Sequence, residues 1–201
     1  INGEDRAEFL QGLITNDIYK CNKDTSIYSC LLSPQGKFLA DFFIINQSNN
    51  YLIEIHEKFY ETFISKLKIY KLRSKVNFIK KENISSIILF GKKIYSIKDT
   101  IASFKDPRNP NIGQKIIINN PKMNIKDIKE ESFCRYKEIL IKNLVPFAPI
   151  DLQENKSLLM ENNLQNLHSI DWDKGCYVGQ EITARMKYRA LLKKKIYSLE
   201  I

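Results

Sequence analysis

The sequence predicts an α+β fold built on antiparallel sheets. Three short runs with strand-like character follow one another without an intervening helix, at residues 26–32, 38–45 and 51–55. Long helix-like segments occur only at irregular intervals, at residues 57–72 and 127–144. A doubly wound fold would instead alternate strands with helices along the chain. We therefore expect antiparallel sheets with a few packed helices.

The N-terminal part of the chain contains the clearest elements. Residues 4–14 predict a helix, and the turn-forming residues 15–17 end it. The strands at 26–32 and 38–45 are joined by residues 33–37, whose Pro and Gly are typical of a hairpin loop. The helix at 57–72 carries one apolar stripe, formed by Phe59, Phe63, Leu67 and Tyr70. We interpret this stripe as core.

The C-terminal part is less regular. Strands are predicted at residues 76–79, 86–90, 93–97 and 115–118, and the helix at 127–144 ends before Pro146 and Pro149. Residues 150–172 are polar and irregular, with one short helical piece at 158–162, and a helix-compatible run covers 180–185. Residues 197–201 alternate like a strand cut short. Since the chain also begins without Met, we expect it to be part of a longer protein.

Composition and charge set limits on the class of protein. The chain has 201 residues, 43% of them hydrophobic and 27% charged, as in ordinary soluble domains. It has no apolar run of membrane-spanning length and no signal-peptide pattern. The net charge of +9 would suit RNA, a polyglutamylated cofactor or an acidic protein. Because the lysines are scattered, we interpret them as solvated surface and expect neither membrane association nor direct nucleic-acid binding.

Cysteine spacing excludes a self-contained metal site. The chain has Cys21, Cys30, Cys134 and Cys176, with no Cys-x-x-Cys pair, and its two histidines lie far from them in sequence. Reduced thiols in a cytosol-like compartment are therefore expected.

Residues 174–181 carry the densest chemistry in the sequence, reading Lys-Gly-Cys-Tyr-Val-Gly-Gln-Glu. Two glycines bracket Cys176 and Tyr177, so the backbone can turn tightly or approach a bound group. Lys174 and a following helix N-terminus would both favour the thiolate form of Cys176. The alternative is a glycine-rich turn that carries a passive cysteine.

Other chemistries find little support. Neither a Walker pattern nor Gly-x-Gly-x-x-Gly occurs, which argues against nucleotide hydrolysis and Rossmann-type redox chemistry. His168 could pair with Cys176 as a catalytic base, but it lies in no motif and a structural role is favoured. Trp172 could stack on a planar ligand or serve the core.

The motif at 174–181 resembles that of the YgfZ-type folate-binding proteins, relatives of the glycine-cleavage T-protein, an aminomethyltransferase. The motif set is Lys174, Gly175, Cys176, Tyr177, Gly179, Gln180 and Glu181, and the continuation through Arg185 and Tyr188 also matches. Residues 1–17 resemble the family's opening, and residues 35–41 resemble its first hairpin. The resemblance implies a T-protein-like fold around a folate-binding hole over residues 1–190, with a subdomain break near 75–125. Residues 191–201 would begin a truncated C-terminal β-barrel.

Two departures from the aminomethyltransferases indicate a protein that is not an enzyme. Their hairpin carries two adjacent acidic residues, the first catalytic, whereas this chain has Ala40 followed by Asp41. A methyl group cannot take part in proton transfer. At the place of their pterin-recognising Glu this chain has Lys142, which has donors but no acceptor.

The resemblance implies an accessory factor for the assembly or repair of iron–sulfur clusters in client enzymes, including tRNA-modifying ones. Cys176 would be the working thiol, as a cluster ligand shared with an A-type carrier. Tetrahydrofolate or a related folate would contact Tyr136, Asp41 and Asn16, although Tyr136 also fits the apolar stripe of its helix. The expected compartment is a bacterial cytoplasm or the mitochondrial matrix. The alternatives are a folate-dependent one-carbon transferase that uses Asp41 and, more weakly, a basic RNA-binding module.

Overall fold

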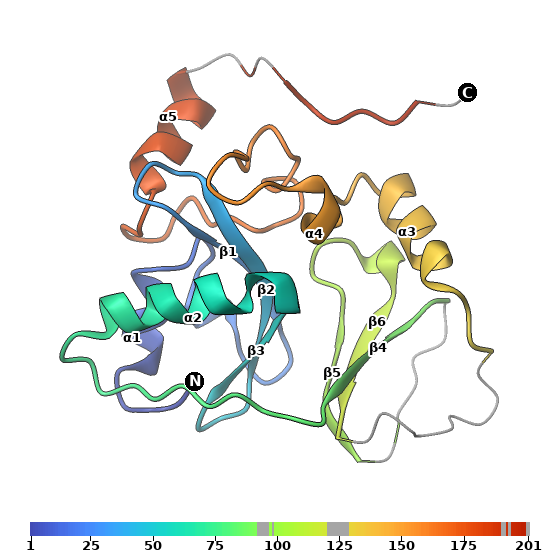
Figure 1. Cartoon of the computed structure of the whole chain (residues 1–201), viewed down its shortest axis with the longest axis horizontal. Coiled ribbons are helices and arrows are strands. Elements are labelled where there is room, and N and C mark those ends of the chain that lie inside the picture. The colour runs from blue at the N-terminus through green and yellow to red at the C-terminus, as the bar shows by residue number, and fades with distance from the viewer. Residues whose placement is uncertain (92–96, 98, 120–128, 190–191, 193, 200–201) are drawn as a thin grey trace.

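A computed structural model of the chain describes residues 1–91, 97, 99–119, 129–189, 192 and 194–199 (Figure 1). Its first sheet is antiparallel in the order β1-β2-β3, formed by β1 (Ile27–Leu32), β2 (Phe38–Asn46) and β3 (Tyr51–Ile55). The second sheet is antiparallel in the order β4-β6-β5, formed by β4 (Ser85–Leu89), β6 (Gln114–Ile118) and β5 (Thr100–Lys105). The α+β prediction with antiparallel sheets is confirmed.

Five α-helices and two short 3-10 turns are found in the part of the chain that the structure describes. The α-helices are α1 (Arg6–Gln11), α2 (Glu57–Lys71), α3 (Phe133–Lys142), α4 (Ala148–Asp151) and α5 (Gln180–Arg189). The 3-10 turns are η1 (Ile18–Lys20) and η2 (Pro110–Ile112). Across these described residues, no helix is both long and apolar enough to cross a bilayer.

The two faces of the first sheet have different neighbours. On one face, the ring of Phe42 packs 4.8 Å from that of Phe63 in α2, so α2 covers this side (Figure 1). On the other face, the ring of Phe43 lies 5.7 Å from that of Phe104 in β5. Because side chains alternate along a strand, Asp41 shares the face of Phe43, and Ala40 shares the face of Phe42. The second sheet thus closes the face of β2 that carries Asp41.

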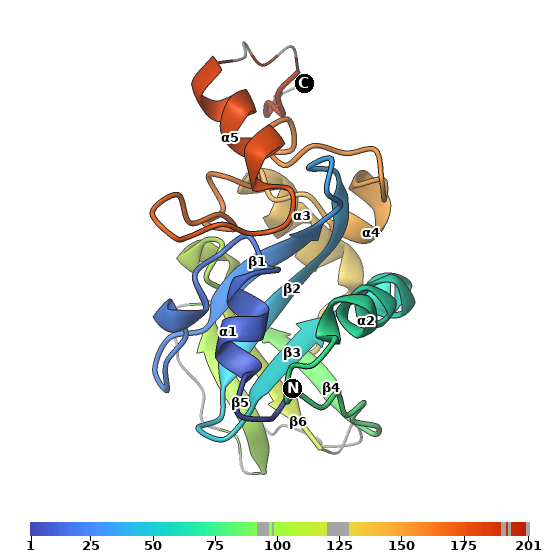
Figure 2. The same cartoon turned by 90° about the vertical axis from the view of Figure 1, so that its left-hand side faces the viewer.

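The β1–β2 hairpin lies beside α5 in both views (Figures 1 and 2). Its turn is closed by hydrogen bonds from the Ser33 amide to the Lys37 carbonyl and from the Gly36 amide to the Ser33 carbonyl. Gly36 has a φ of 69°, which glycine adopts without strain. The predicted hairpin at residues 33–37 is confirmed, and its turn lies against α5.

Three elements predicted from the sequence are not found as predicted. In each case either side-chain hydrogen bonds hold another local conformation, or the segment pairs with no neighbouring strand among the described residues. Residues 76–79 form no strand beyond an isolated bridge of Asn77 with Asn2, although Val76 is buried as its apolar character suggests. Residues 159–168 are turns, since the side chain of Asn162 bonds the Leu158 carbonyl and Asn163 adopts a φ of 62°. Residues 194–199 form no strand, and Tyr197 and Leu199 are exposed.

Helix and strand boundaries account for the other differences. The predicted helix at 4–14 is limited to α1, and the described part of the one at 127–144 is helical only from Phe133 to Lys142. Pro149 does not merely end a helix; it lies in the first turn of α4, where proline is well accommodated. Strand β5 was not predicted, because its sequence lacks a strong apolar alternation. Most of the predicted strand at 93–97 lies outside the described residues.

Candidate functional site

The motif residues 174–179 form a loop that leads into α5 and packs against residues 11–17. The amide of Val178 donates to the Gly12 carbonyl at 3.2 Å, and the amide of Asp171 donates to the Thr15 carbonyl at 3.0 Å. Thr15 also donates its hydroxyl to the Ser169 carbonyl at 2.6 Å. The two stretches that carry the family resemblance, at opposite ends of the chain, therefore form one structural unit.

Lys174 points into this unit. Its side chain is buried, and its Nζ donates to the carbonyl oxygens of Gln11, Ile14 and Asn16 at 2.7, 2.7 and 2.9 Å. An ammonium group has three donors, so all three are used on these carbonyls. Burial lowers the pKa of Lys174 to about 8.

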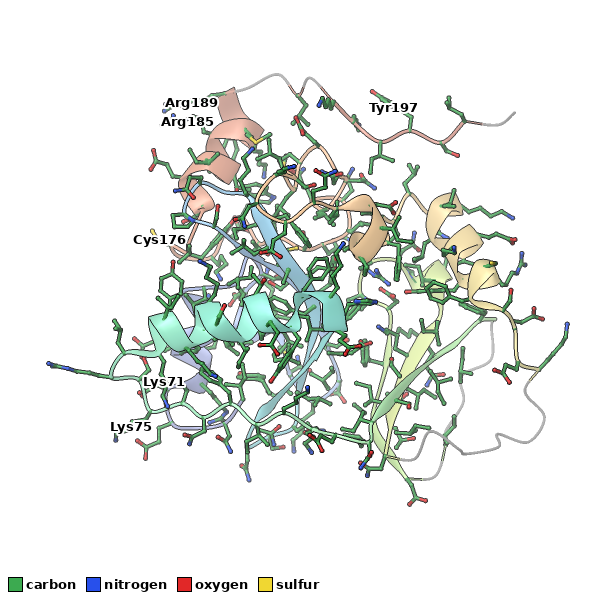
Figure 3. The ribbon with its side chains drawn as sticks, viewed as in Figure 1. Lys71, Lys75, Cys176, Arg185, Arg189 and Tyr197 are labelled. Atoms are coloured by element: carbon green, nitrogen blue, oxygen red, sulfur yellow. The ribbon has the colours of Figure 1, made fainter. Side chains whose placement is uncertain are left out.

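Cys176 points the other way. Both Cys176 and Gly175 are exposed, and Figure 3 shows Cys176 at the edge of the molecule. A Cβ placed on Gly175 would meet nothing within 4 Å, so the loop is open at this point. By contrast, burial raises the pKa of the Cys21 thiol to about 11 and that of the Cys30 thiol well above its usual value. Those two thiols are structural.

Tyr177 and Gly179 attach the loop to the protein body. The Tyr177 side chain is buried, and the Lys174 Nζ lies 5.1 Å from its ring centroid. Burial raises the pKa of the Tyr177 hydroxyl well above its usual value. Gly179 has a φ of 84°, and a Cβ there would lie 2.6 Å from the Ser33 carbonyl oxygen. A glycine is therefore required where the motif meets the β1–β2 hairpin.

The last motif residues begin α5. The Gln180 amide donates to the Tyr177 carbonyl at 3.1 Å, and Arg185 forms an exposed ion pair with Glu181 at 3.0 Å. Further along, the Lys187 Nζ lies 4.0 Å from the ring centroid of Trp172. The last turn of α5 carries Lys187 and Arg189 and is therefore cationic.

A second polar cluster lies between the two sheets and contains the predicted folate contacts. The Tyr28 hydroxyl donates to Asp41 Oδ2 at 2.8 Å, and the Asn16 amide group donates to the Tyr28 carbonyl at 2.8 Å. Arg108 donates to the Tyr136 hydroxyl at 3.0 Å, and its guanidinium carbon lies 5.4 Å from the Tyr28 ring centroid. Tyr28 and Arg108 thus connect Asn16, Asp41 and Tyr136.

Sequence reasoning missed both connecting residues. Arg108 is buried and forms a two-bond ion pair with Asp106, with nitrogen–oxygen distances of 2.9 and 2.7 Å. The signal was an acidic and a basic residue two positions apart inside the proline-rich loop 106–110. Burial raises the pKa of Asp41, and a carboxyl with a perturbed pKa inside a polar cluster is a typical candidate for a functional group.

The orientation of β2 changes the meaning of Ala40. Ala40 is fully buried on the α2 side of the sheet, whereas Asp41 faces the polar cluster. An acidic residue at position 40 would point toward α2, whereas Asp41 bonds to the Tyr28 hydroxyl and interacts electrostatically with Arg108. Lys142 is exposed at the end of α3 and is not part of this cluster. Asp41 is therefore the acidic residue of this hairpin that faces the interior cluster.

A hollow of about 380 Å³ opens beside Asn16 and Tyr28. Trp172 and His168 also line it, and Lys20 pairs with Asp171 at its rim. The Tyr136 ring instead is buried and stacks on Phe90 at 6.0 Å, so it offers no open face. Among the described residues, no group of three or more His, Cys, Asp or Glu could hold a metal ion.

Comparison with known proteins supports the resemblance over the whole chain. No family model matches the chain. It is 31% identical over 218 aligned positions to a protein of Mycosarcoma maydis named "Iron-sulfur cluster assembly factor IBA57 homolog, mitochondrial", with 99% of this chain and 54% of that protein covered. Proteins of the same name from Neurospora crassa and Dictyostelium discoideum are each 27% identical, covering 98% and 97% of this chain and 50% and 58% of their own lengths.

The fold agrees with that family. The glycine cleavage system aminomethyltransferase T from Bartonella henselae superposes with a TM-score of 0.61 at 11% identity, covering 92% of this chain and 59% of that structure. The chain belongs to the YgfZ/IBA57 type of the aminomethyltransferase-like superfamily. As a member of this type it spans about half the length of the curated relatives it matches. The antiparallel T-protein-like architecture predicted from the motifs is confirmed.

Proposed function

We propose that the protein is an accessory factor that assembles or repairs iron–sulfur clusters in client enzymes, with Cys176 as its working thiol. The relatives matched over nearly the whole chain carry the name of iron–sulfur cluster assembly factors. The observation that carries the proposal is the exposure of Cys176 on an open turn whose neighbours are held inside the protein.

The cluster would be shared with a partner. An iron–sulfur cluster is normally held by about four thiolates, and Cys176 belongs to no metal-binding group within the described part of the chain. An A-type carrier would supply the remaining ligands. The client enzymes, tRNA-modifying ones among them, would receive the completed [4Fe–4S] cluster. Because the matched relatives are named mitochondrial, we favour the mitochondrial matrix over a bacterial cytoplasm as the compartment.

A pair of cysteine variants tests this role. Cys176→Ser should abolish the rescue of cluster-dependent enzyme activity in a strain that lacks the protein. Cys134→Ser is the matched control, because Cys134 is also exposed but lies on α3 outside the motif. It should rescue like the wild type. Undiminished rescue by Cys176→Ser would reject the thiol-centred proposal.

Folate would bind in the hollow beside Asn16 and Tyr28 rather than on Tyr136. The hollow is of the size of small-molecule sites and offers the Trp172 ring as a flat apolar wall. Asp41 does not line the hollow itself but accepts a hydrogen bond from Tyr28, which does. A pterin that enters beyond Tyr28 would offer its amino-pyrimidine edge to this carboxylate. The bound folate would supply a one-carbon carrier, and these residues would orient it.

Calorimetric titration with 5-formyltetrahydrofolate tests this placement. Asp41→Asn should weaken binding by about tenfold or more, since one acceptor becomes a donor. Asp24→Asn, at an exposed carboxylate of the loop before β1, should bind like the wild type. Equal affinities for all three proteins would show that folate does not use this cluster.

The position of Asp41 also favours a second candidate, a folate-dependent one-carbon transferase. Its carboxyl has the inward orientation and the raised pKa that suit proton transfer in a buried site. Methylene transfer from an aminomethyl donor to tetrahydrofolate, measured with wild type and with Asp41→Asn, decides between the two. Turnover that disappears in the variant would establish the transferase. We expect none in either protein.

A further inference from the structure

The loop of residues 174–179, called the cysteine loop below, reverses the direction of its side chains within three residues. Lys174 is 8% exposed and directed inward, Gly175 has open space around it, and Cys176 is exposed. Tyr177 is again buried, at 6% exposure. The charge and the thiol that are neighbours in sequence therefore lie on opposite sides of the loop backbone.

The acceptors of Lys174 all belong to one short segment. Gln11 is the last residue of α1, so its carbonyl oxygen belongs to a helix C-terminus, where a cation is favourable. The carbonyl oxygens of Ile14 and Asn16 complete the set. This segment is held in turn by Gln11, whose side chain donates to Asp17 at 2.9 Å and accepts from the Ile18 amide at 2.9 Å. The segment 11–16 is therefore held in place and offers Lys174 three fixed carbonyl acceptors.

The chemistry of an ammonium group decides what Lys174 can do. Its three N–H donors are directed at three backbone carbonyls, so its positive charge is stabilised by those dipoles inside the protein. A cation that activates a thiol must instead direct its field at the sulfur across a short distance.

We propose that Lys174 is a positioning residue that holds the cysteine loop on the segment 11–16 and thereby fixes where Cys176 is presented. The importance of that placement rests on the proposed role of Cys176 in cluster assembly. The same side chain bonds to the carbonyl of Asn16, a residue that lines the hollow proposed for folate. One lysine thus supports both the thiol and the wall of the ligand site.

Hydrogen exchange and alkylation of the folded chain test this role, in a Cys134→Ser background where Cys176 is the one exposed cysteine. In Lys174→Met, the amides of residues 11–16 and 174–178 should lose protection by about tenfold or more, because the three anchoring bonds are gone. The pH midpoint of Cys176 alkylation should stay within about half a unit of the parent. Cluster transfer from a loaded carrier should fall by about tenfold.

Two further variants make the result decisive. Lys105→Met removes an exposed lysine of β5 and should change none of the three measurements. Lys174→Gln is neutral but keeps two N–H donors, so its amides should retain part of the protection against exchange. If Lys174→Met does not fold, all three measurements are made on Lys174→Gln. An alkylation midpoint raised by about one unit or more in both Lys174 variants would show that the lysine activates the thiol, and would overturn the proposal. Unchanged protection in both variants would overturn it as well.

Failure of the proposed function gives a different result. If Cys176→Ser transfers clusters like the wild type, the thiol-centred function is rejected. Hydrogen exchange in the Lys174 variants would still show whether this side chain holds the loop.

Discussion

The inner and outer halves of the cysteine loop follow different rules. On the inner side, Lys174, Tyr177 and Gly179 are fitted to the segment 11–16 and to the β1–β2 hairpin. On the outer side, Gly175 and Cys176 face open space. Adjacent residues of one motif thus divide into scaffold and working surface. Substitutions on the inner side should therefore change stability first, and those on the outer side should change activity first.

Ion pairs show the same contrast between buried and exposed residues. They are expected to give the largest difference in the free energy of unfolding. Arg108→Met would leave the buried carboxylate of Asp106 without its guanidinium partner. Breaking a buried pair in this way costs about 3–5 kcal/mol. The free energy of unfolding, measured in urea, should fall by this amount.

The exposed pair of Arg135 and Glu138 on α3 is the matched control. Arg135→Met should lower the unfolding free energy by at most about 1 kcal/mol, as is usual for solvated pairs. Similar losses in the two variants would mean that burial does not separate the two classes.

The two glycines of the motif give the next largest difference. Gly179→Ala would force a Cβ to within 2.6 Å of the Ser33 carbonyl oxygen, at a φ of 84°. Steric strain of this kind costs about 2–4 kcal/mol. Gly175→Ala adds the same methyl group in open space and should change the unfolding free energy by less than about 0.5 kcal/mol. Equal losses from the two substitutions would contradict the division of the loop into two halves.

The sequence predicted the sheets well because their signals are local. Residues 33–37 carry both the Pro and the Gly of the hairpin, and β3 was predicted at residues 51–55, where it is found. Strand β5 was missed because its place depends on pairing with β6 rather than on its own residues. The exposed Cys176 was also identified from its motif. Lys174 was singled out as a cation that would favour the Cys176 thiolate, but its inward direction was not predictable, because its acceptors lie some 160 positions away in sequence.

The interior cluster shows the same limit. Asp41 was named as a folate contact and Ala40 as the place of the family's catalytic Asp, but which of the two faces the interior cluster is not visible in one sequence. Pairing of Tyr28 with Phe43 fixes the strand register and turns Asp41 toward the cluster. The roles of Arg108 and Tyr28 in this cluster depend on the packing of the second sheet against the first, which the sequence does not show.

The smallest expected effect concerns Tyr177 and refines the rule for the inner half. Its hydroxyl oxygen is buried without a hydrogen-bond partner among the described residues, so the ring packs while the hydroxyl contributes nothing. Tyr177→Phe removes an unsatisfied polar atom and keeps the ring beside Lys174. The unfolding free energy should stay constant or rise by about 1 kcal/mol. Cys176 alkylation in the same variant should be unchanged, since the loop keeps its anchors. A loss of stability above about 1 kcal/mol would show that the hydroxyl has a partner, and the inner half would then be held by a polar contact at Tyr177 as well as at Lys174.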